Sequence, residues 1–269
     1  LNVRGSELWV EFTADWDIHE PWYSFMVNGE FFSRRMAQKG TERVCVFRGM
    51  DPEKVKNVRI FKDTQAMNAD PESVLQINAV ETDGEFLPVP ERNLKIEFIG
   101  DSITSGEGDI GAKAETDWIS MFFSAENNYA VMVSRALNAD IRVSSQSGWG
   151  VCCGWNNDPN SAIPPIYGQL CGLSSGEKNI ALGAKEPYDF TKWQPNYVFI
   201  NLGTNDCGAF SQPAWTDETT GETFQNRRTE DGKLNPEDEA RFAHGATAFL
   251  KQLRGYYPNA LSLIHISEP

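Results

Sequence analysis

Histidine is scarce in this chain, in which only His19, His244 and His265 occur among 269 residues. Long apolar runs are also missing, because no run approaches the ~20 residues needed to span a bilayer. No signal-peptide pattern opens the chain. Since the chain begins at Leu1 without a methionine, this last absence does not exclude an export signal upstream.

Positive charge is in short supply as well. The chain has 24 Lys and Arg residues against 38 Asp and Glu residues, which gives a formal net charge of −14. This balance disfavours nucleic acid and anionic membrane surfaces as partners. It also argues mildly against polyanionic substrates such as pectate.

The five cysteines are too few and too irregular for a structural framework of disulfides. Their odd number fits neither a complete set of disulfides nor a zinc site with two spaced pairs. Cys152 and Cys153 are adjacent and Cys207 follows a polar motif, so some of them are candidates to border a pocket. We favour the simpler interpretation that they are small buried hydrophobic residues.

The first third of the chain has the pattern of β structure. Asn28 and Gly29 supply the two positive-φ residues of a tight type I′ hairpin. Many short strands at regular spacing indicate a sandwich. The expected strands are 8–12, 22–27, 30–32, 44–47, 58–61 and 74–78. We expect a jelly-roll-like β-sandwich domain over residues 1–88 and, after a proline-stiffened crossing at 87–92, an α/β domain over residues 89–269.

Two apolar strands of the second domain, at 94–99 and 197–200, end in polar motifs. The first runs into Gly-Asp-Ser-Ile-Thr, and the second into Asn-Leu-Gly-Thr-Asn-Asp. Because the carboxyl ends of parallel strands share one edge of the sheet, Ser102 and Asn205 can converge on one ligand. Between them a short strand at 140–144 runs into Ser-Gln-Ser-Gly-Trp-Gly, where Gly148 lets its N–H approach a substrate closely.

These residue types suit acyl transfer. A serine hydroxyl is a weak nucleophile until a base takes its proton, and the tetrahedral intermediate needs fixed donors on its oxyanion. Ser102 is the candidate nucleophile. The N–H groups of Ser102 and Gly148 and the carboxamide of Asn205 are the candidate oxyanion donors. We expect Asp101 to order the turn, because a carboxylate beside the nucleophile cannot also hold an imidazole from the far strand.

The three motifs, in this order, resemble those of the SGNH (GDSL-type) hydrolases. Ser102 falls on the family's nucleophile, Gly148 on the glycine of its second block and Asn205 on the asparagine of its third. The resemblance is specific because each extended motif follows an apolar strand, and it covers roughly residues 94–260. It implies a doubly wound parallel sheet, and it implies neither a metal nor an organic cofactor.

A β-sandwich in front of an SGNH domain resembles carbohydrate esterase family two, whose members remove acetyl groups from plant polysaccharides. The resemblance implies a serine esterase that deacetylates xylan or glucomannan through an acyl-enzyme, with the acetylated polysaccharide or oligosaccharide as its partner. It also favours a secreted or cell-surface location. Two alternatives stay open, namely an SGNH lipase or thioesterase and a carbohydrate-binding protein without catalytic activity.

Three long polar segments with aromatic residues follow the motif strands, at 107–128, 151–190 and 207–234. Loops at the carboxyl edge of a doubly wound sheet surround its active crevice, and loops this long are usually functional or disordered. Flat aromatic faces beside a serine suit a sugar ring. Trp149 and Trp155 are therefore the candidate substrate contacts, and we prefer Trp149 because it directly follows Gly148. The alternative is that each tryptophan anchors its own loop.

The sequence leaves the general base unidentified. In the resembled family a histidine near the C-terminus activates the serine, often with an aspartate three residues before it, and none of the three histidines here has that aspartate. We expect His19 in a loop of the β domain, His244 on the solvent side of a helix at 235–254, and His265 within a strand at 261–266.

We therefore interpret the chain as a fragment whose SGNH domain lacks its C-terminal part. The family's topology continues past that strand through a helix and the histidine loop, whereas this sequence stops at Pro269. Residues 261–269 also resemble translated adaptor sequence, so a foreign origin for part of this ending stays open. Residues 1–269 are expected to be inactive because the catalytic histidine is missing.

Overall fold

The computed structural model describes the backbone of residues 1–265 and the side chains of residues 1–264. The contacts within it divide the chain into two compact units. Unit 1 comprises Leu1–Glu91, Gly108–Asn127 and Leu173–Lys185. Unit 2 comprises Arg92–Glu107, Asn128–Gly172 and the described residues from Glu186 onward. Two segments that follow motif strands, 108–127 and 173–185, thus belong to the same unit as the N-terminal strands.

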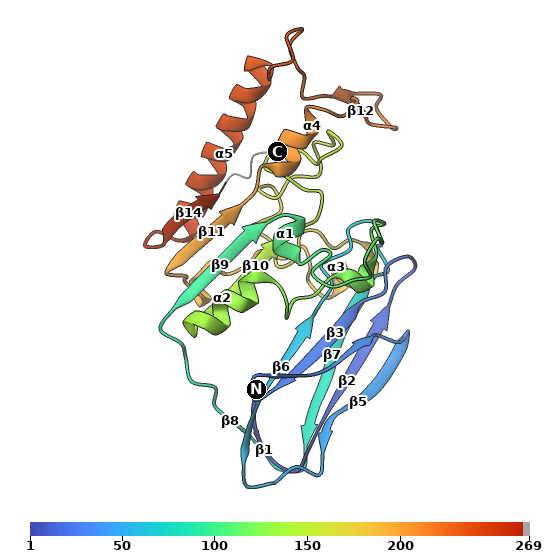
Figure 1. The fold of residues 1–269 in the computed structure, drawn as a ribbon, viewed down its shortest axis with the longest axis vertical. Helices are drawn as coiled ribbons and strands as arrows, with labels where there is room; N and C mark the ends of the chain where they lie inside the picture. The colour runs from blue at the N-terminus through green and yellow to red at the C-terminus, as the bar shows by residue number, and fades with distance from the viewer. Residues whose placement is uncertain (266–269) are drawn as a thin grey trace. The chain divides into compact units, whose positions relative to one another are not determined.

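Unit 1 is built from two antiparallel sheets (Figure 1). The larger sheet has the order β4 (Glu30–Met36), β3 (Trp22–Val27), β6 (Val55–Lys62), β1 (Asn2–Arg4) and β8 (Glu85–Leu87). The smaller sheet has the order β5 (Gly40–Arg48), β2 (Glu7–Asp15) and β7 (Val74–Thr82). Alternate residues of β2 are buried, and they share one core with apolar residues of both sheets. This is the arrangement that a β-sandwich requires.

The hairpin and the strands that the sequence predicts for unit 1 are present in the structure. Asn28 and Gly29 both have positive φ, at 54° and 86°, and join β3 to β4 as the expected hairpin. The expected strands are present and are mostly longer than the apolar runs suggested. The short strands β1 and β8 were not predicted, because three residues carry too little alternation to be recognised.

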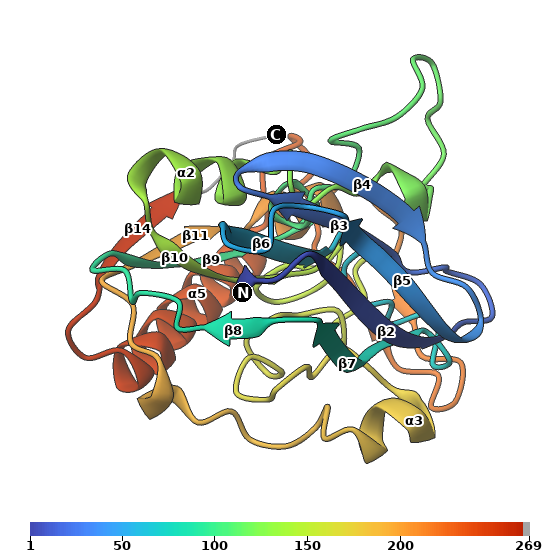
Figure 2. The ribbon, with the colours of Figure 1, turned by 90° about the horizontal axis from the view of Figure 1, so that it is seen from below.

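Unit 2 contains a parallel sheet with the order β10 (Asp140–Ser145), β9 (Lys95–Gly100), β11 (Tyr197–Asn201) and β14 (Leu261–His265). Helices α2 (Tyr129–Leu137) and α5 (Pro236–Tyr256) cover its opposite faces (Figure 2). Ile96 and Phe98 of β9 pack towards α2, whereas Ile99 packs in the cluster that includes Phe249 of α5. Helices on both faces confirm the predicted doubly wound parallel sheet.

Helix α5 has capping and proline signals at both of its ends. The Asn235 side chain accepts a hydrogen bond from the N–H of Glu237, Pro236 occupies the first turn, and three acidic residues follow. Pro258 lies just beyond its last residue and cannot continue the helix. The apolar side of α5, which includes Phe249 and Leu253, is buried against the sheet.

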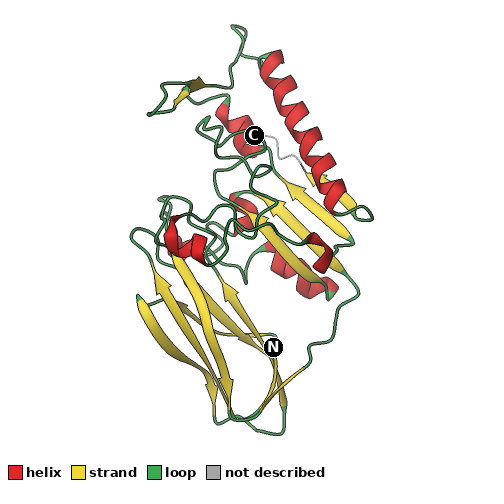
Figure 3. Ribbon diagram, turned by 180° about the vertical axis from the view of Figure 1, so that it is seen from behind, coloured by secondary structure: helices red, strands yellow, loops and turns green. Residues whose placement is uncertain are grey.

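The long polar segments contain short elements of their own (Figure 3). These elements are η1 (Ser120–Phe122), α3 (Gly176–Ala181), η2 (Phe190–Lys192), β12 (Trp215–Thr216) and β13 (Thr223–Phe224). Two further short helices, α1 (Ser102–Ser105) and α4 (Thr204–Ala209), directly follow β9 and β11. Strands β9 and β11 therefore lead into short helices, whereas β10 leads into turns.

A buried ion pair fixes the register of β9 and β10. Glu97 is fully buried, and Arg142, its partner in the ladder, places Nε 3.6 Å from the Glu97 Oε1 atom. The Ser144 hydroxyl donates to the same carboxylate oxygen at 3.2 Å. The Arg142 guanidinium lies 3.6 Å from the centre of the Tyr188 ring. A shift of register would separate the buried Glu97 carboxylate from Arg142, at a high cost in free energy.

Candidate active site

The three polar motifs leave the parallel sheet at its topological switch point. The chain runs from β9 to β10 on one side and then crosses to β11 on the other side of β9. Gly100 lies opposite Ser145 and opposite Asn201 in the two ladders. Ligands of open α/β sheets bind at such a point, beyond the carboxyl ends of the strands.

Ser102 is the first residue of α1 and is half-buried. The Asp101 Oδ1 atom accepts a hydrogen bond from the N–H of Ile103 at 3.2 Å, so Asp101 caps this helix and orders the turn as expected. Burial raises the pKa of the Asp101 carboxyl group. Gly100 makes the tight turn possible, because a Cβ atom there would lie 2.0 Å from the Thr104 hydroxyl oxygen.

The second motif is attached directly to the first. The N–H of Gln146 donates to the Gly100 carbonyl at 3.1 Å, and the Ser105 hydroxyl donates to the Ser145 hydroxyl at 2.9 Å. Gly148 has a φ of +77°, a conformation that favours glycine. These contacts hold the Gly148 segment beside the helix that carries Ser102.

The third motif is attached to the second. Gly203, with a φ of +117°, turns the chain into α4, and the Asn205 Nδ2 atom donates to the Trp149 carbonyl at 2.8 Å. One Nδ2 proton of Asn205 remains for another acceptor. Within residues 1–265, no hydrogen bond from the N–H of Ser102 or of Gly148 is found. Three donors are therefore available at the edge where Ser102 lies.

The two candidate tryptophans have different environments. Trp155 is 53% exposed, and its backbone N–H donates to the Gly148 carbonyl at 2.9 Å. Its ring lies against Gly148, where a Cβ atom would be 3.0 Å from the indole Cδ1 atom. Trp149 is partly buried and packs against the core cluster beneath α5. Only Trp155 presents an open aromatic face next to the candidate oxyanion glycine.

The positions of the histidines agree with the expectations, and the base stays unidentified. His19 lies in unit 1 in the loop after β2, with its ring edge-on to Trp118 at 4.8 Å between centroids. His244 lies exposed on α5. His265 ends β14 opposite Asn201, and its side chain lies outside the described ones, as does residue 266 of the predicted strand. Among the described side chains, none forms a hydrogen bond with the Ser102 hydroxyl that would identify a base.

Sequence reasoning overlooked Asp206. Its buried carboxylate accepts hydrogen bonds from the N–H groups of Val151, Cys152 and Cys153, at 2.8, 2.7 and 3.3 Å. An acidic residue directly after Asn205, the candidate oxyanion donor, was the only signal in the sequence. Burial and the nearby Asp206 charge raise the pKa of the Cys152 and Cys153 thiols to about 11 and about 12, which fits their interpretation as neutral core residues.

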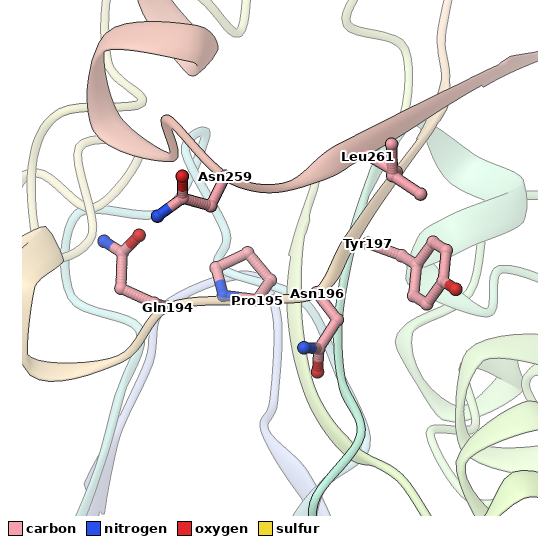
Figure 4. Close-up of a pocket in the computed structure, with 6 residues that line it drawn as sticks. All are labelled: Gln194, Pro195, Asn196, Tyr197, Asn259 and Leu261. Carbon is pink, nitrogen blue, oxygen red and sulfur yellow. The ribbon is translucent and has the colours of Figure 1, made fainter.

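A depression of about 400 Å³ lies elsewhere, at the amino edge of the sheet (Figure 4). It is lined by Gln194, Pro195, Asn196, Tyr197, Asn259 and Leu261. Its Gln194 and Asn196 amides bond to backbone groups of the fold. Because Tyr197 and Leu261 begin β11 and β14, this depression is at the opposite edge from Ser102 and is not part of the candidate site.

The described residues offer no gathering of three His, Cys, Asp or Glu side chains that could hold a metal ion. Within the same residues, none of the helices combines the length and the apolar character that a bilayer crossing needs. The candidate site consists of a serine, backbone N–H groups and a carboxamide, and these donors can stabilise the oxyanion of an acyl-transfer intermediate once a base has taken the serine proton.

Comparison with known proteins gives close structural relatives. An acetyl xylan esterase (Est2A) from the rumen bacterium Butyrivibrio proteoclasticus is 45% identical with a TM-score of 0.95, over 99% of this chain and 71% of that one. A family two carbohydrate esterase from Clostridium thermocellum, solved with cellohexaose, has the same fold with 24% identity and a TM-score of 0.76, over 99% and 70%. No protein-family model matches the chain.

Curated relatives match over shorter parts. An acetylxylan esterase / glucomannan deacetylase from Cellvibrio japonicus is 28% identical over 123 residues, which is 45% of this chain and 31% of that protein. The chain spans between 23% and 33% of the length of the curated relatives that it matches.

Proposed function

The chain belongs to family two of the carbohydrate esterases, and from this premise we propose that the protein removes acetyl groups from acetylated xylan or glucomannan. The observation that carries the proposal is the grouping of Ser102 with three available hydrogen-bond donors at the switch point of the sheet. The similarity to an acetyl xylan esterase over nearly the whole chain supports the choice of substrate.

In the proposed reaction, Ser102 Oγ attacks the acetyl carbonyl carbon while a base takes the hydroxyl proton. The negative charge that develops on the carbonyl oxygen is stabilised by the N–H groups of Ser102 and Gly148 and by the Asn205 amide. The sugar oxygen takes this proton from the base and leaves as a hydroxyl group. Water then hydrolyses the acetyl-serine, which releases acetate and regenerates Ser102.

Trp155 is the better of the two candidate sugar contacts. Its exposed ring beside Gly148 offers a flat apolar face of the kind on which a sugar ring stacks. We propose that Trp149 acts indirectly, because its carbonyl accepts the Asn205 amide and its ring packs in the core.

The proposal is tested with the polypeptide that the natural gene encodes. We expect it to release acetate from acetylated xylan or glucomannan, and we expect Ser102→Ala to abolish the release while the fold is retained. A preference for long acyl chains would favour the lipase or thioesterase alternative. Binding of the polysaccharide without any release of acetate would favour a carbohydrate-binding protein and contradict the proposal.

A further inference from the structure

The Asp206 carboxylate occupies a cradle of backbone N–H groups. Its Oδ2 atom accepts from Val151, and its Oδ1 atom accepts from Cys152 and Cys153. The side chain is 3% exposed, so these bonds are shielded from water. Three consecutive N–H groups that face one carboxylate fix the path of the chain that makes them.

The position of Gly150 is adapted to this carboxylate. A Cβ atom on Gly150 would lie 2.2 Å from the Asp206 Oδ2 atom and 2.4 Å from the Cys153 carbonyl oxygen, so only glycine leaves room for both. Gly150 is also held from its other side, because its N–H donates to the Ser161 carbonyl at 3.2 Å and its carbonyl accepts from Ile163 at 3.0 Å.

Asn205 and Asp206 together bind every residue of the segment 149–153 except Gly150. The Asn205 amide donates to the Trp149 carbonyl, and the Asp206 carboxylate accepts from the N–H groups of residues 151–153. Gly148, the candidate oxyanion donor, immediately precedes this segment. Contacts from the first turn of α4 therefore hold the segment that directly follows Gly148.

We infer that Asp206 is a positioning residue for the oxyanion site, which holds the 151–153 segment so that the Gly148 N–H stays aligned with the substrate carbonyl. This inference rests on the proposed esterase function. Asp206 itself makes no contact with the reacting atoms in this role, and its effect passes through Val151, Cys152 and Cys153.

Neighbouring groups agree with this role. Cys152 and Cys153 are the titratable groups beside the carboxylate, and the Asp206 charge helps keep both thiols neutral. Burial raises the pKa of Asp206 to about 6, although the three N–H donors favour its ionised form. The buried environment disfavours the charged form of the carboxylate, whereas the three N–H donors stabilise that form because they need a hydrogen-bond acceptor.

The test compares Asp206→Asn with Asp70→Asn in the natural polypeptide. Asp70 is a matched control, because it is also buried and accepts N–H bonds from Asp17, Ile18 and His19, all of which belong to unit 1, whereas Ser102, Gly148 and Asn205 belong to unit 2. Hydrogen exchange of the Val151, Cys152 and Cys153 amides is measured together with kcat and KM for a small aryl acetate.

We expect Asp206→Asn to speed exchange of these three amides by at least about tenfold and to lower kcat by about 10- to 100-fold with little change in KM. Asp70→Asn should leave both measurements near those of the wild type. Unchanged exchange, or an unchanged kcat in a folded Asp206→Asn protein, would overturn the inference.

If the wild type has no esterase activity, the proposed function fails, while the exchange measurement still decides whether Asp206 holds the segment. If Asp206→Asn does not fold, Asp206→Glu keeps the charge but places the carboxylate one methylene group further along, so it no longer fits the three N–H groups. That variant should show the same faster exchange at Val151, Cys152 and Cys153, and protection equal to the wild type would contradict the inference.

Discussion

Trp149 and Trp155 are six positions apart in the sequence, and their rings have opposite exposures. Trp155 lies open beside Gly148, and Trp149 is partly buried against the core. A tryptophan that stacks on sugar contributes to the binding of an oligosaccharide and little to the binding of a small ester, whereas one that packs in the core supports both reactions equally.

We therefore expect Trp155→Ala to raise KM for an acetylated oligosaccharide by about tenfold or more and to leave KM for a small aryl acetate nearly unchanged. Trp149→Ala should lower thermal stability and reduce turnover of both substrates. Steady-state kinetics on the two substrates with thermal unfolding of each variant checks this. Equal losses on both substrates for Trp155→Ala would contradict its role as a sugar contact.

Asn205 makes a structural contact and, in the proposed reaction, also a catalytic one. Its Nδ2 atom donates to the Trp149 carbonyl, which orients the amide and leaves one proton for the oxyanion. We expect Asn205→Ala to lower kcat by about 10²–10³ with little change in KM, as for other oxyanion donors. Asn259→Ala, an exposed change at the opposite edge of the sheet, is the control. An unchanged kcat would remove Asn205 from the site.

The Ser102 hydroxyl has no described histidine bonded to it. A serine without a base keeps its proton, and loss of a triad histidine costs about 10⁶ in kcat elsewhere. If no group within residues 1–269 acts as this base, a polypeptide of these residues should hydrolyse aryl acetates at a rate close to that of its Ser102→Ala variant. The polypeptide from the natural gene serves as the reference. Rapid hydrolysis by residues 1–269 that is lost in His265→Ala would contradict this and identify His265 as the base.

Among the elements, the segment around η1 is anchored to the strands of unit 1 by a buried ion pair. The Arg34 Nη2 atom donates to the Met121 and Phe123 carbonyls at 2.8 and 2.9 Å, and its Nε atom lies 3.1 Å from the Asp63 carboxylate. The same carboxylate accepts from the N–H of Ala125 at 3.1 Å. Burial raises the pKa of Asp63, so this carboxylate depends on its partners to stay ionised.

Arg34→Met should destabilise unit 1 by about 3–5 kcal/mol, because it leaves the buried Asp63 carboxylate unpaired. Arg4→Met breaks the pair between Arg4 and Glu85, whose side chains are 45% and 56% exposed, and should cost less than about 1 kcal/mol. Chemical denaturation measures both changes, and hydrogen exchange at Ala125 reports on the anchored segment. A loss for Arg34→Met no larger than that for Arg4→Met would show that the anchor contributes little.

For the whole molecule, two buried aspartates in unit 2 make the stability depend on pH in opposite directions. Asp238 is fully buried between Arg227 and Arg241 at 2.9 and 2.7 Å. Burial alone would raise its pKa, but the hydrogen bonds and charges of these arginines outweigh burial and lower the pKa to about 2. Asp206, buried without an arginine partner, has its pKa raised to about 6.

The folded state holds the Asp238 proton less tightly than the unfolded state, so its contribution to stability is present above about pH 4 and is lost as the pH falls to about 2. Asp206 contributes more as the pH falls from about 6 towards 4, because its folded state binds the proton more tightly. We expect Asp238→Asn to be destabilised at pH 7 and to approach the wild type near pH 2. Unfolding free energies across this range check this, and a constant difference between the two proteins would contradict it.

The sequence by itself determined the features that neighbouring residues can encode. Alternating apolar residues predicted the strands of unit 1, Asn28 and Gly29 predicted their hairpin, and the two strand-terminal motifs predicted a parallel sheet with Ser102 and Asn205 at one edge. These features depend on φ preferences, on side-chain periodicity and on the direction of parallel strands, all of which are local properties of the chain.

Only the tertiary structure decided the contacts between residues that are distant in the sequence. Asp206 meets the N–H of Val151 from 55 positions away, and Arg34 meets the Phe123 carbonyl from 89 positions away. The different environments of Trp149 and Trp155, and the grouping of residues 108–127 and 173–185 with unit 1, depend in the same way on what packs against them. Such contacts form only when a particular donor and acceptor are buried together, and no periodicity or local propensity along the chain specifies which ones will meet.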